Sequence, residues 1–182
     1  MIRFPEIAEN DRSEDQRKVV AEIASGPRGG VRGPFVALLH APELARRVAH
    51  LGEYLRFNNS LDNAIAEFAV LITARQCTAQ FEFFAHARHA RNAGVDPAII
   101  EAIARREPPP GLSPAQGAVY DFCMELHRRH AVSDANFQRI VDLYGHRGAA
   151  DLIALTGYYT MVAMVLNVAE VPVPPGEKPP LD

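Results

Sequence analysis

The sequence predicts an all-α protein, and three observations support this fold class. Two capping boxes, Ser13–Gln16 and Ser113–Gln116, each precede a segment with helical periodicity. Apolar residues recur at spacings of three and four along most of the chain. No stretch alternates apolar and polar residues for long enough to form a strand. We therefore expect a bundle of about seven to nine helices, with segment lengths typical of globular helices.

Composition narrows the class of protein further. The chain has 182 residues, 48% of them apolar, which suits one domain with a substantial core. A net charge of −3 gives no electrostatic argument for a nucleic-acid or anionic-membrane partner. Cys77 and Cys123 form no CxxC pair, so we expect reduced thiols rather than a disulfide framework. With an N-terminus too charged for a signal peptide, we expect a cytoplasmic protein.

The first third of the chain predicts short helices around a glycine-rich loop. A helix runs from Glu14 to about Ala24, and residues 25–33 form a mobile loop. No strand precedes this loop, so it is not a phosphate-binding loop of the strand–loop–helix kind. A helical turn follows over residues 35–40, and Pro42 begins the next helix. The apolar residues of that helix that we expect to face the core are Leu44, Val48, Leu51 and Leu55.

The middle of the chain contains two helices with a break between them. The first begins near Asp62 and ends at Gln76–Thr78, where Thr78 is the expected N-cap of the second. The second ends at Gly94, a residue that readily takes a left-handed cap conformation. Asp96-Pro97 then caps a further helix, to about Arg106.

The last third predicts three helices and an extended tail. Pro108–Gly111 forbids helix, and Ser113 and Ser133 each cap a helix that follows. Gly145 closes the second of these, and residues 148–169 form a long apolar helix. We expect one domain over residues 1–171, in which residues 1–32 supply the N-terminal helix and loop. The proline-rich residues 172–182 would be an extended, mobile tail.

The apolar segment Leu152–Ala169 is 18 residues long and uncharged, so a membrane span has to be considered. Polar residues such as Asn167 dilute it, and Asp151 and Glu170 bound it. We interpret it as a buried core or interface helix, with no membrane partner.

One stretch, Glu67–His89, collects ionisable residues inside an apolar run. At 100° per residue, one helical face would hold, within about 80°, Arg75, Ala79, Glu82, His86 and His89. A carboxylate four residues before an imidazole, flanked by aromatic residues, can be partly desolvated. Desolvation shifts both pKa values and suits the pair for proton transfer.

Each of these residues also has a simpler structural interpretation. Glu82 and His86 could be a solvated ion pair on a helix surface. Arg75 could clamp a substrate carboxylate or pair with a glutamate of the same region. Glu82, His86 and His89 could hold a metal, but the spacing is not HExxH and a one-helix triad is strained, so we expect none. Tyr158 is a core or interface aromatic whose hydroxyl could reach a pocket.

Several stretches resemble the carboxymuconolactone decarboxylase family, which shares a superfamily with the AhpD-type thiol alkylhydroperoxidases. The matching segments are GPFVALLHAPELA (residues 33–45), LGEYLRFNNSL (51–61), AEFAVLITARQCTAQFEFFAHARHARNAGV (66–95) and GYYTMVAMVLNVAEV (157–171). The resemblance implies an AhpD-like helical bundle that forms a homo-oligomer (a dimer, trimer or hexamer). It also implies a pocket near the helix with the E-x-x-x-H motif.

The motif of the hydroperoxidases carries over only in part. Their histidine corresponds to His86, their upstream glutamate to Glu67, and their two redox cysteines to Ala79 and Glu82. Dithiol peroxide reduction needs one thiolate to attack and a second to resolve it. The resemblance therefore favours the decarboxylase-like branch, which lacks the cysteine pair and often has glutamate at the position of Glu82.

The resemblance and the residues together suggest a cofactor-independent lyase that acts on a small carboxylated lactone or cyclic acid. His86 would be the general acid/base, Glu82 would orient it or share its proton, and Glu67 would be a relay. The expected substrate-binding residues are Arg75, His89 and Tyr158. Two alternatives remain open: a hydroperoxidase or peroxiredoxin activity that uses Cys77, and a non-catalytic ligand-binding oligomer.

Overall fold

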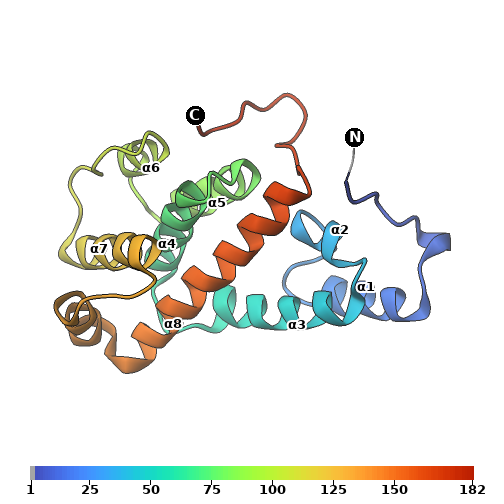
Figure 1. The fold of residues 1–182 in the computed structure, drawn as a ribbon, viewed down its shortest axis with the longest axis horizontal. Coiled ribbons are helices and arrows are strands. Elements are labelled where there is room, and N and C mark those ends of the chain that lie inside the picture. The colour runs from blue at the N-terminus through green and yellow to red at the C-terminus, as the bar shows by residue number, and fades with distance from the viewer. Residues whose placement is uncertain (1–2) are drawn as a thin grey trace.

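The computed structural model describes residues 3–182, which form eight α-helices and no strand, so the all-α prediction is confirmed (Figure 1). The helices are α1 (Glu14–Ser25), α2 (Pro34–Leu38), α3 (Pro42–Glu53), α4 (Asn63–Gln76), α5 (Gln80–Asn92), α6 (Pro97–Ala104), α7 (Pro114–Arg129) and α8 (Asp134–Val168). Two short elements add to these: η1, a 3₁₀ turn (Glu9–Asp11), and η2, a π-helical turn (Tyr54–Asn58) that extends α3.

The local signals for helix ends are mostly confirmed. Ser13 and Ser113 both form reciprocal capping boxes, and Asp96 accepts a hydrogen bond from the backbone of Ala98. Ser133 caps α8, which bends at Gly145, where φ is 67°. The backbone of Gly145 is not helical, so the break predicted there is confirmed, and α8 consists of two helical arms that meet at this residue.

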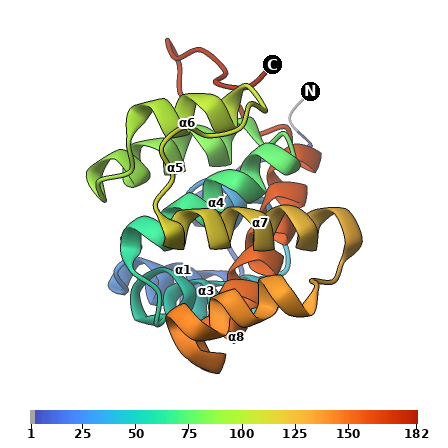
Figure 2. The same ribbon diagram turned by 90° about the vertical axis from the view of Figure 1, so that its left-hand side faces the viewer.

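The core is built around α4. Every residue from Ile65 to Arg75 is buried, so this helix has no solvent-exposed face over that length. It packs against α5, α7 and α8, which surround it in both views (Figures 1 and 2). The ionisable groups on α4 are buried with it, and this sets up the chemistry of Glu67.

The prediction for α3 is wrong at two of its four core residues. Val48 and Leu55 are buried, whereas Leu44 is 50% exposed and Leu51 is 48% exposed. The side of α3 that faces the protein is instead made of small residues, Ala45, Ala49 and Gly52, with Val48. Small side chains let α3 approach its neighbours closely. The prediction failed because a stripe of apolar residues does not by itself show which side of a helix is buried.

The break between α4 and α5 is confirmed, but Thr78 does not cap α5. Thr78 has a φ of 49°, and its N–H donates to the carbonyl of Arg75, while the N–H of Ala79 donates to the carbonyl of Ala74. This pattern is a Schellman motif that ends α4. Ala79 then holds the N-cap position of α5 without a side-chain hydrogen bond.

Residues 172–182 are extended, as expected, but the end of this segment is not free of the bundle. Leu181 is buried, and its backbone exchanges two hydrogen bonds with the side chain of Gln80, at 3.0 and 2.8 Å. The carboxylate of Asp182 pairs with Arg75. The last two residues of this segment therefore contact α4 and α5, which the sequence did not predict.

By length and composition alone, α8 could cross a membrane, as its sequence suggested. In the fold, 56% of its most apolar window is buried inside the protein. Asp151, at the start of that apolar segment, is also buried and accepts hydrogen bonds from Tyr54 and Ser60. This packing is that of a core helix.

Candidate active site

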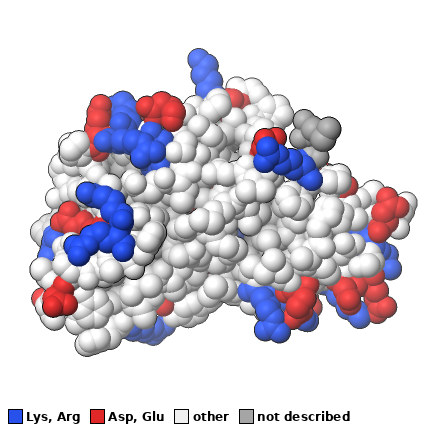
Figure 3. Space-filling view, in the orientation of Figure 1, with Lys and Arg blue, Asp and Glu red and all other residues white. Residues whose placement is uncertain are grey.

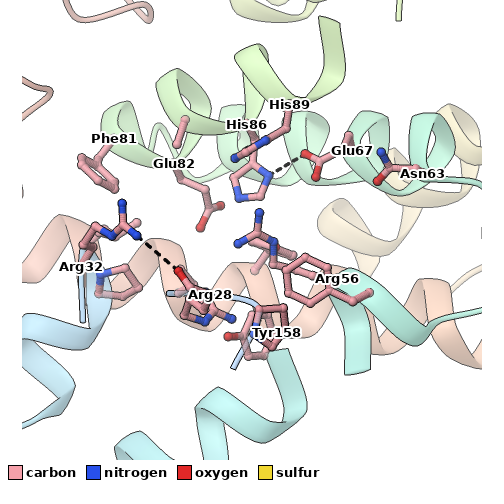
Figure 4. Close-up of a pocket in the computed structure, with 18 of the residues that line it drawn as sticks. Arg28, Arg32, Arg56, Asn63, Glu67, Phe81, Glu82, His86, His89 and Tyr158 are labelled. Carbon is pink, nitrogen blue, oxygen red and sulfur yellow. Dashed lines mark hydrogen bonds and ion pairs between the residues drawn. The ribbon is translucent and has the colours of Figure 1, made fainter. Parts of the chain in front are cut away.

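A cavity of about 840 Å³ lies between α5, the C-terminal arm of α8, the glycine-rich loop and η2 (Figure 4). Its polar lining residues are Arg28, Arg32, Arg56, Asn59, Asn63, Glu67, Glu82, His86, His89, Asn92, Tyr158 and Tyr159. The cavity therefore combines acids, imidazoles and guanidinium groups.

Two neighbouring helices supply the acid and imidazole groups. Glu82, His86 and His89 follow one another at spacings of four and three, so they share one face of α5. Glu67 projects from α4, which packs against α5. These four residues line the same cavity, and Figure 4 shows them on one wall of it.

Glu67 and His86 form a buried hydrogen-bonded pair. His86 Nδ1 lies 2.6 Å from Glu67 Oε2, and each side chain is 10% exposed. Burial raises the pKa of Glu67, but the hydrogen bond and the charge of His86 outweigh it and hold that pKa below its ordinary value. Since an ionised carboxylate only accepts, Nδ1 donates its proton to Glu67. Nε2 makes no hydrogen bond within residues 3–182 and is left for a cavity ligand.

The surroundings of Glu82 favour the opposite protonation state. Its side chain is 2% exposed, and neither carboxyl oxygen has a hydrogen-bond partner among the described residues. Burial raises the pKa of Glu82 well above its ordinary value, which favours the neutral, protonated form of its carboxyl group. Two carboxyl groups with pKa values pushed apart are the arrangement that separates acid from base in an enzyme.

Aromatic and imidazole rings hold His86 from two sides. The Tyr159 ring meets it edge-on with 4.9 Å between centroids, and the His89 ring does so at 5.6 Å. Burial is the largest contribution to a lowered pKa of His89, which favours its neutral form. Tyr158 is buried on α8, and burial raises the pKa of its hydroxyl, so it stays a hydrogen-bond donor.

Three arginines line the cavity opposite α5, and the sequence analysis missed all of them. Arg28 and Arg32 come from the glycine-rich loop, and Arg56 comes from η2 (Figure 4). The guanidinium of Arg28 lies 4.6 Å from the centroid of the Phe35 ring, which it faces. The available signal was the run PRGGVRG at residues 27–33, where two arginines alternate with glycines.

Two glycines let these elements come together. Gly33 has a φ of 58°, and a Cβ there would lie 2.9 Å from the Phe81 ring on α5. A Cβ on Gly52 would overlap the Tyr158 hydroxyl and lie 2.7 Å from Nη2 of Arg28. The glycine at position 33 therefore lets the glycine-rich loop pack against α5, and the glycine at position 52 lets Arg28 lie beside Tyr158.

Arg75 does not reach this cavity, contrary to the sequence-based expectation. It is buried on α4, lines a separate cavity of about 140 Å³, and pairs with Asp182. The prediction continued one helical face from Arg75 to His89. The Schellman motif at Thr78 turns the chain between them, so the two helices do not share that face.

No metal site assembles from the expected residues. Within residues 3–182, no group of three His, Cys, Asp or Glu side chains is arranged to hold a metal ion. Glu82, His86 and His89 share the cavity wall without converging on one point.

The two cysteines are outside the cavity lining and are poor thiolates. Burial, with a contribution from Glu82, raises the pKa of Cys77. Burial also raises the pKa of Cys123 to about 12. Peroxide chemistry needs an accessible thiolate, and the raised pKa values disfavour the thiolate form of both residues.

No known protein-family model matches this chain, and neither does any curated protein sequence. Among solved structures, the chain is similar to the alkylhydroperoxidase AhpD core of an uncharacterized peroxidase-related protein from Ralstonia eutropha JMP134. The TM-score is 0.78 at 19% identity, and the likeness covers 95% of this chain and 92% of the other. At this identity the likeness speaks for the fold, and the chain has the AhpD-like helical fold.

Proposed function

We propose that this protein is a cytoplasmic, cofactor-independent lyase that removes CO2 from a small carboxylated lactone or related cyclic acid. The observation that carries the proposal is that the hydrogen-bonded Glu67–His86 pair and the buried, unpartnered Glu82 share one wall of the cavity. On such a wall, His86 can deliver a proton, and a protonated Glu82 can donate a hydrogen bond to a developing negative charge.

The reaction breaks the bond between the carboxylate carbon and the ring. CO2 leaves, and the electron pair stays on the substrate as a dienolate, which then needs one proton. We assign that proton to His86 Nε2, which takes it from solvent and passes it to the substrate carbon. Glu67 holds the imidazole through Nδ1 and stabilises the imidazolium when it forms.

Glu82 would act as a hydrogen-bond donor to the dienolate oxygen. Its buried carboxyl group makes no hydrogen bond to the described residues. A hydrogen bond to a ligand would therefore not require an existing one to be broken. Being neutral, it does not repel the anion, whereas an ionised carboxylate at this place would. His89 and Tyr158 complete the polar lining and are the proposed substrate contacts.

The hydroperoxidase alternative is weaker for this chain. The similar crystal structure is that of a peroxidase-related protein, yet the described residues that line this cavity include no cysteine. The raised pKa of Cys77 disfavours its thiolate. A non-catalytic ligand-binding role is the outcome to accept if no acid of the class named above is turned over.

We also propose that the protein is a homo-oligomer. The C-terminal arm of α8 carries three exposed apolar residues, Ile153, Met164 and Val168, which lie within about 60° of one another on the helix. Figure 3 shows that the face along which this arm runs has a broad centre free of Lys, Arg, Asp and Glu. An apolar face bounded by charged residues is typical of an interface between protein chains.

The chemistry can be tested in deuterium oxide with a panel of carboxylated lactones and cyclic acids. We expect a product with one deuteron on the carbon that lost CO2, in a single configuration, because a fixed group delivers it. A racemic deuterated product would show protonation by free solvent and would remove His86 from its assigned role.

A further inference from the structure

The wall opposite α5 contains positive charge that the protein itself leaves unpaired. Arg28 and Arg56 both line the cavity (Figure 4), and the ion pairs formed within residues 3–182 include neither of them. Nη2 of Arg28 is buried and has no hydrogen-bond partner among these residues. A buried N–H donor without a partner is costly, and such a donor in a cavity wall is satisfied when a ligand supplies the acceptor.

Each guanidinium group lies over the face of an aromatic ring. Arg28 stacks on Phe35, with 4.6 Å from its guanidinium carbon to the ring centroid, and Arg56 stacks on Phe57 at 5.1 Å. Stacking fixes the plane of a guanidinium while its N–H groups stay available along the edge. Phe35 is 1% exposed and so supports Arg28 from the core, whereas Phe57, beneath Arg56, is 47% exposed.

The hydroxyl of Tyr158 belongs to the same cluster. A Cβ on Gly52 would overlap this hydroxyl and nearly touch Nη2 of Arg28, so both groups occupy the space that a side chain at position 52 would fill. Tyr158 also lies near enough to Arg28 and Arg56 to feel the charge of both. Three donors thus converge from the loop, η2 and α8.

We propose that Arg28 and Arg56, with the hydroxyl of Tyr158, form a clamp for a carboxylate that the ligand keeps throughout the reaction. The inference rests on the proposed function and deepens it, since it assigns to these residues the anchoring role that the sequence suggested for Arg75. Two guanidinium edges and a hydroxyl match the several lone pairs of one carboxylate.

The clamped carboxylate anchors the ligand and is not the group that leaves as CO2. An ion pair with two arginines stabilises a carboxylate in the ground state and so opposes its loss as CO2. In this proposal the departing carboxylate is a second one, which lies beside the buried Glu82 and makes no bidentate pair with the clamp. Anchoring by the retained group then sets the distance of the reacting carbon from His86.

Binding of simple anions tests the clamp without any turnover. Isothermal titration of the full chain would compare benzoate with its neutral analogue benzamide and with phenyl phosphate. We expect benzoate to bind one-to-one, benzamide to bind at least about tenfold more weakly, and phenyl phosphate not to exceed benzoate. Failure of benzoate to bind would overturn the clamp, and clear preference for phenyl phosphate would overturn the assignment to a carboxylate.

Variants then locate the site. Arg28→Gln and Arg56→Gln should each weaken benzoate binding at least about tenfold, since each removes a charge-assisted pair. Arg88→Gln, on the exposed side of α5, and Arg75→Gln should change it less than about twofold. Equal binding by Arg28→Gln, Arg56→Gln and the wild type would contradict the clamp.

Loss of folding can be separated from loss of the clamp. Arg28→Lys keeps the positive charge but loses the planar fork, so it should fold and bind benzoate with an affinity between those of wild type and Arg28→Gln. Wild-type affinity in this variant would show that charge alone suffices and would overturn the fork geometry. Benzoate binding also differs from turnover as a readout. A protein that binds benzoate through Arg28 but turns over no acid would retain the clamp and lose the lyase proposal.

Discussion

His86 on α5 and Glu67 on α4 share a hydrogen bond of 2.6 Å, although 19 residues separate them in the chain. The bond fixes one ring nitrogen as the donor and leaves the other toward the cavity. Every role proposed for His86 depends on this orientation, and the packing of α4 against α5 maintains it.

Glu67→Gln tests the orientation directly. An amide can donate to Nδ1 and so favours the tautomer with its proton on Nε2, which is the wrong nitrogen for accepting a proton from solvent. We expect turnover of any active acid to fall about 10²–10⁴-fold, the usual effect of losing general acid–base catalysis. Nitrogen-15 NMR of the imidazole should show the tautomer change. The control Glu101→Gln, on the exposed surface of α6, should leave both the turnover and the tautomer of His86 unchanged.

The raised pKa of Glu82 predicts an unusual pH dependence of stability. The native state keeps a proton that the unfolded chain releases near pH 4.5, so the free energy of unfolding falls as pH rises from there toward the native pKa. Glu82→Gln removes this loss, which for one proton reaches at most about 1.4 kcal/mol per pH unit. In urea unfolding at pH 5 to 8, the free energy of unfolding of Glu82→Gln should increase relative to that of the wild type as pH rises. A constant or shrinking difference would mean that Glu82 is ionised in the native protein.

Gly52→Ala tests the close approach of Tyr158 and Arg28. In an ordinary helix interior this change stabilises by about 0.5–1 kcal/mol. Here the new methyl group overlaps the Tyr158 hydroxyl, so we expect a net loss of about 1–2 kcal/mol and weaker benzoate binding. Gly117→Ala on α7, where the methyl group meets nothing closer than 3.9 Å, is the matched control and should be neutral or stabilising. The idea fails if the two substitutions behave alike in thermal unfolding.

The exposed apolar face of α8 predicts self-association. Light scattering coupled to gel filtration should give the mass of a homo-oligomer for the wild type, and Met164→Glu should dissociate it by placing a charge in the interface. Leu143→Glu, an equally apolar exposed residue on the other arm of α8, should not. A monomeric wild type would argue against this face as an interface.

The sequence predicted helix ends well because the responsible signals are local. The capping boxes at Ser13 and Ser113 need only four consecutive residues, and both form as expected. Thr78 shows the limit of such reasoning, because a threonine before a helix suggests an N-cap. The competing Schellman bonds at the end of α4 decide its conformation instead.

The proton-transfer half of the site was predictable, whereas the arginine half was not. Glu82 and His86 lie on one helix, so their spacing places them on one face. Arg28 and Arg56 come from an irregular loop and a π-helical turn, where no periodicity fixes the direction of a side chain. They meet across the cavity through tertiary packing at Gly33 and Gly52, which the sequence shows only as small residues.

The most direct test of the central claim is CO2 release from a panel of carboxylated lactones by the wild type, His86→Ala and the surface variant His50→Ala. We expect turnover by the wild type and by His50→Ala, and a loss of at least about 10²-fold in His86→Ala. Turnover that survives in His86→Ala, or no release of CO2 from any acid by the wild type, would contradict the account of this cavity as a proton-transfer lyase site.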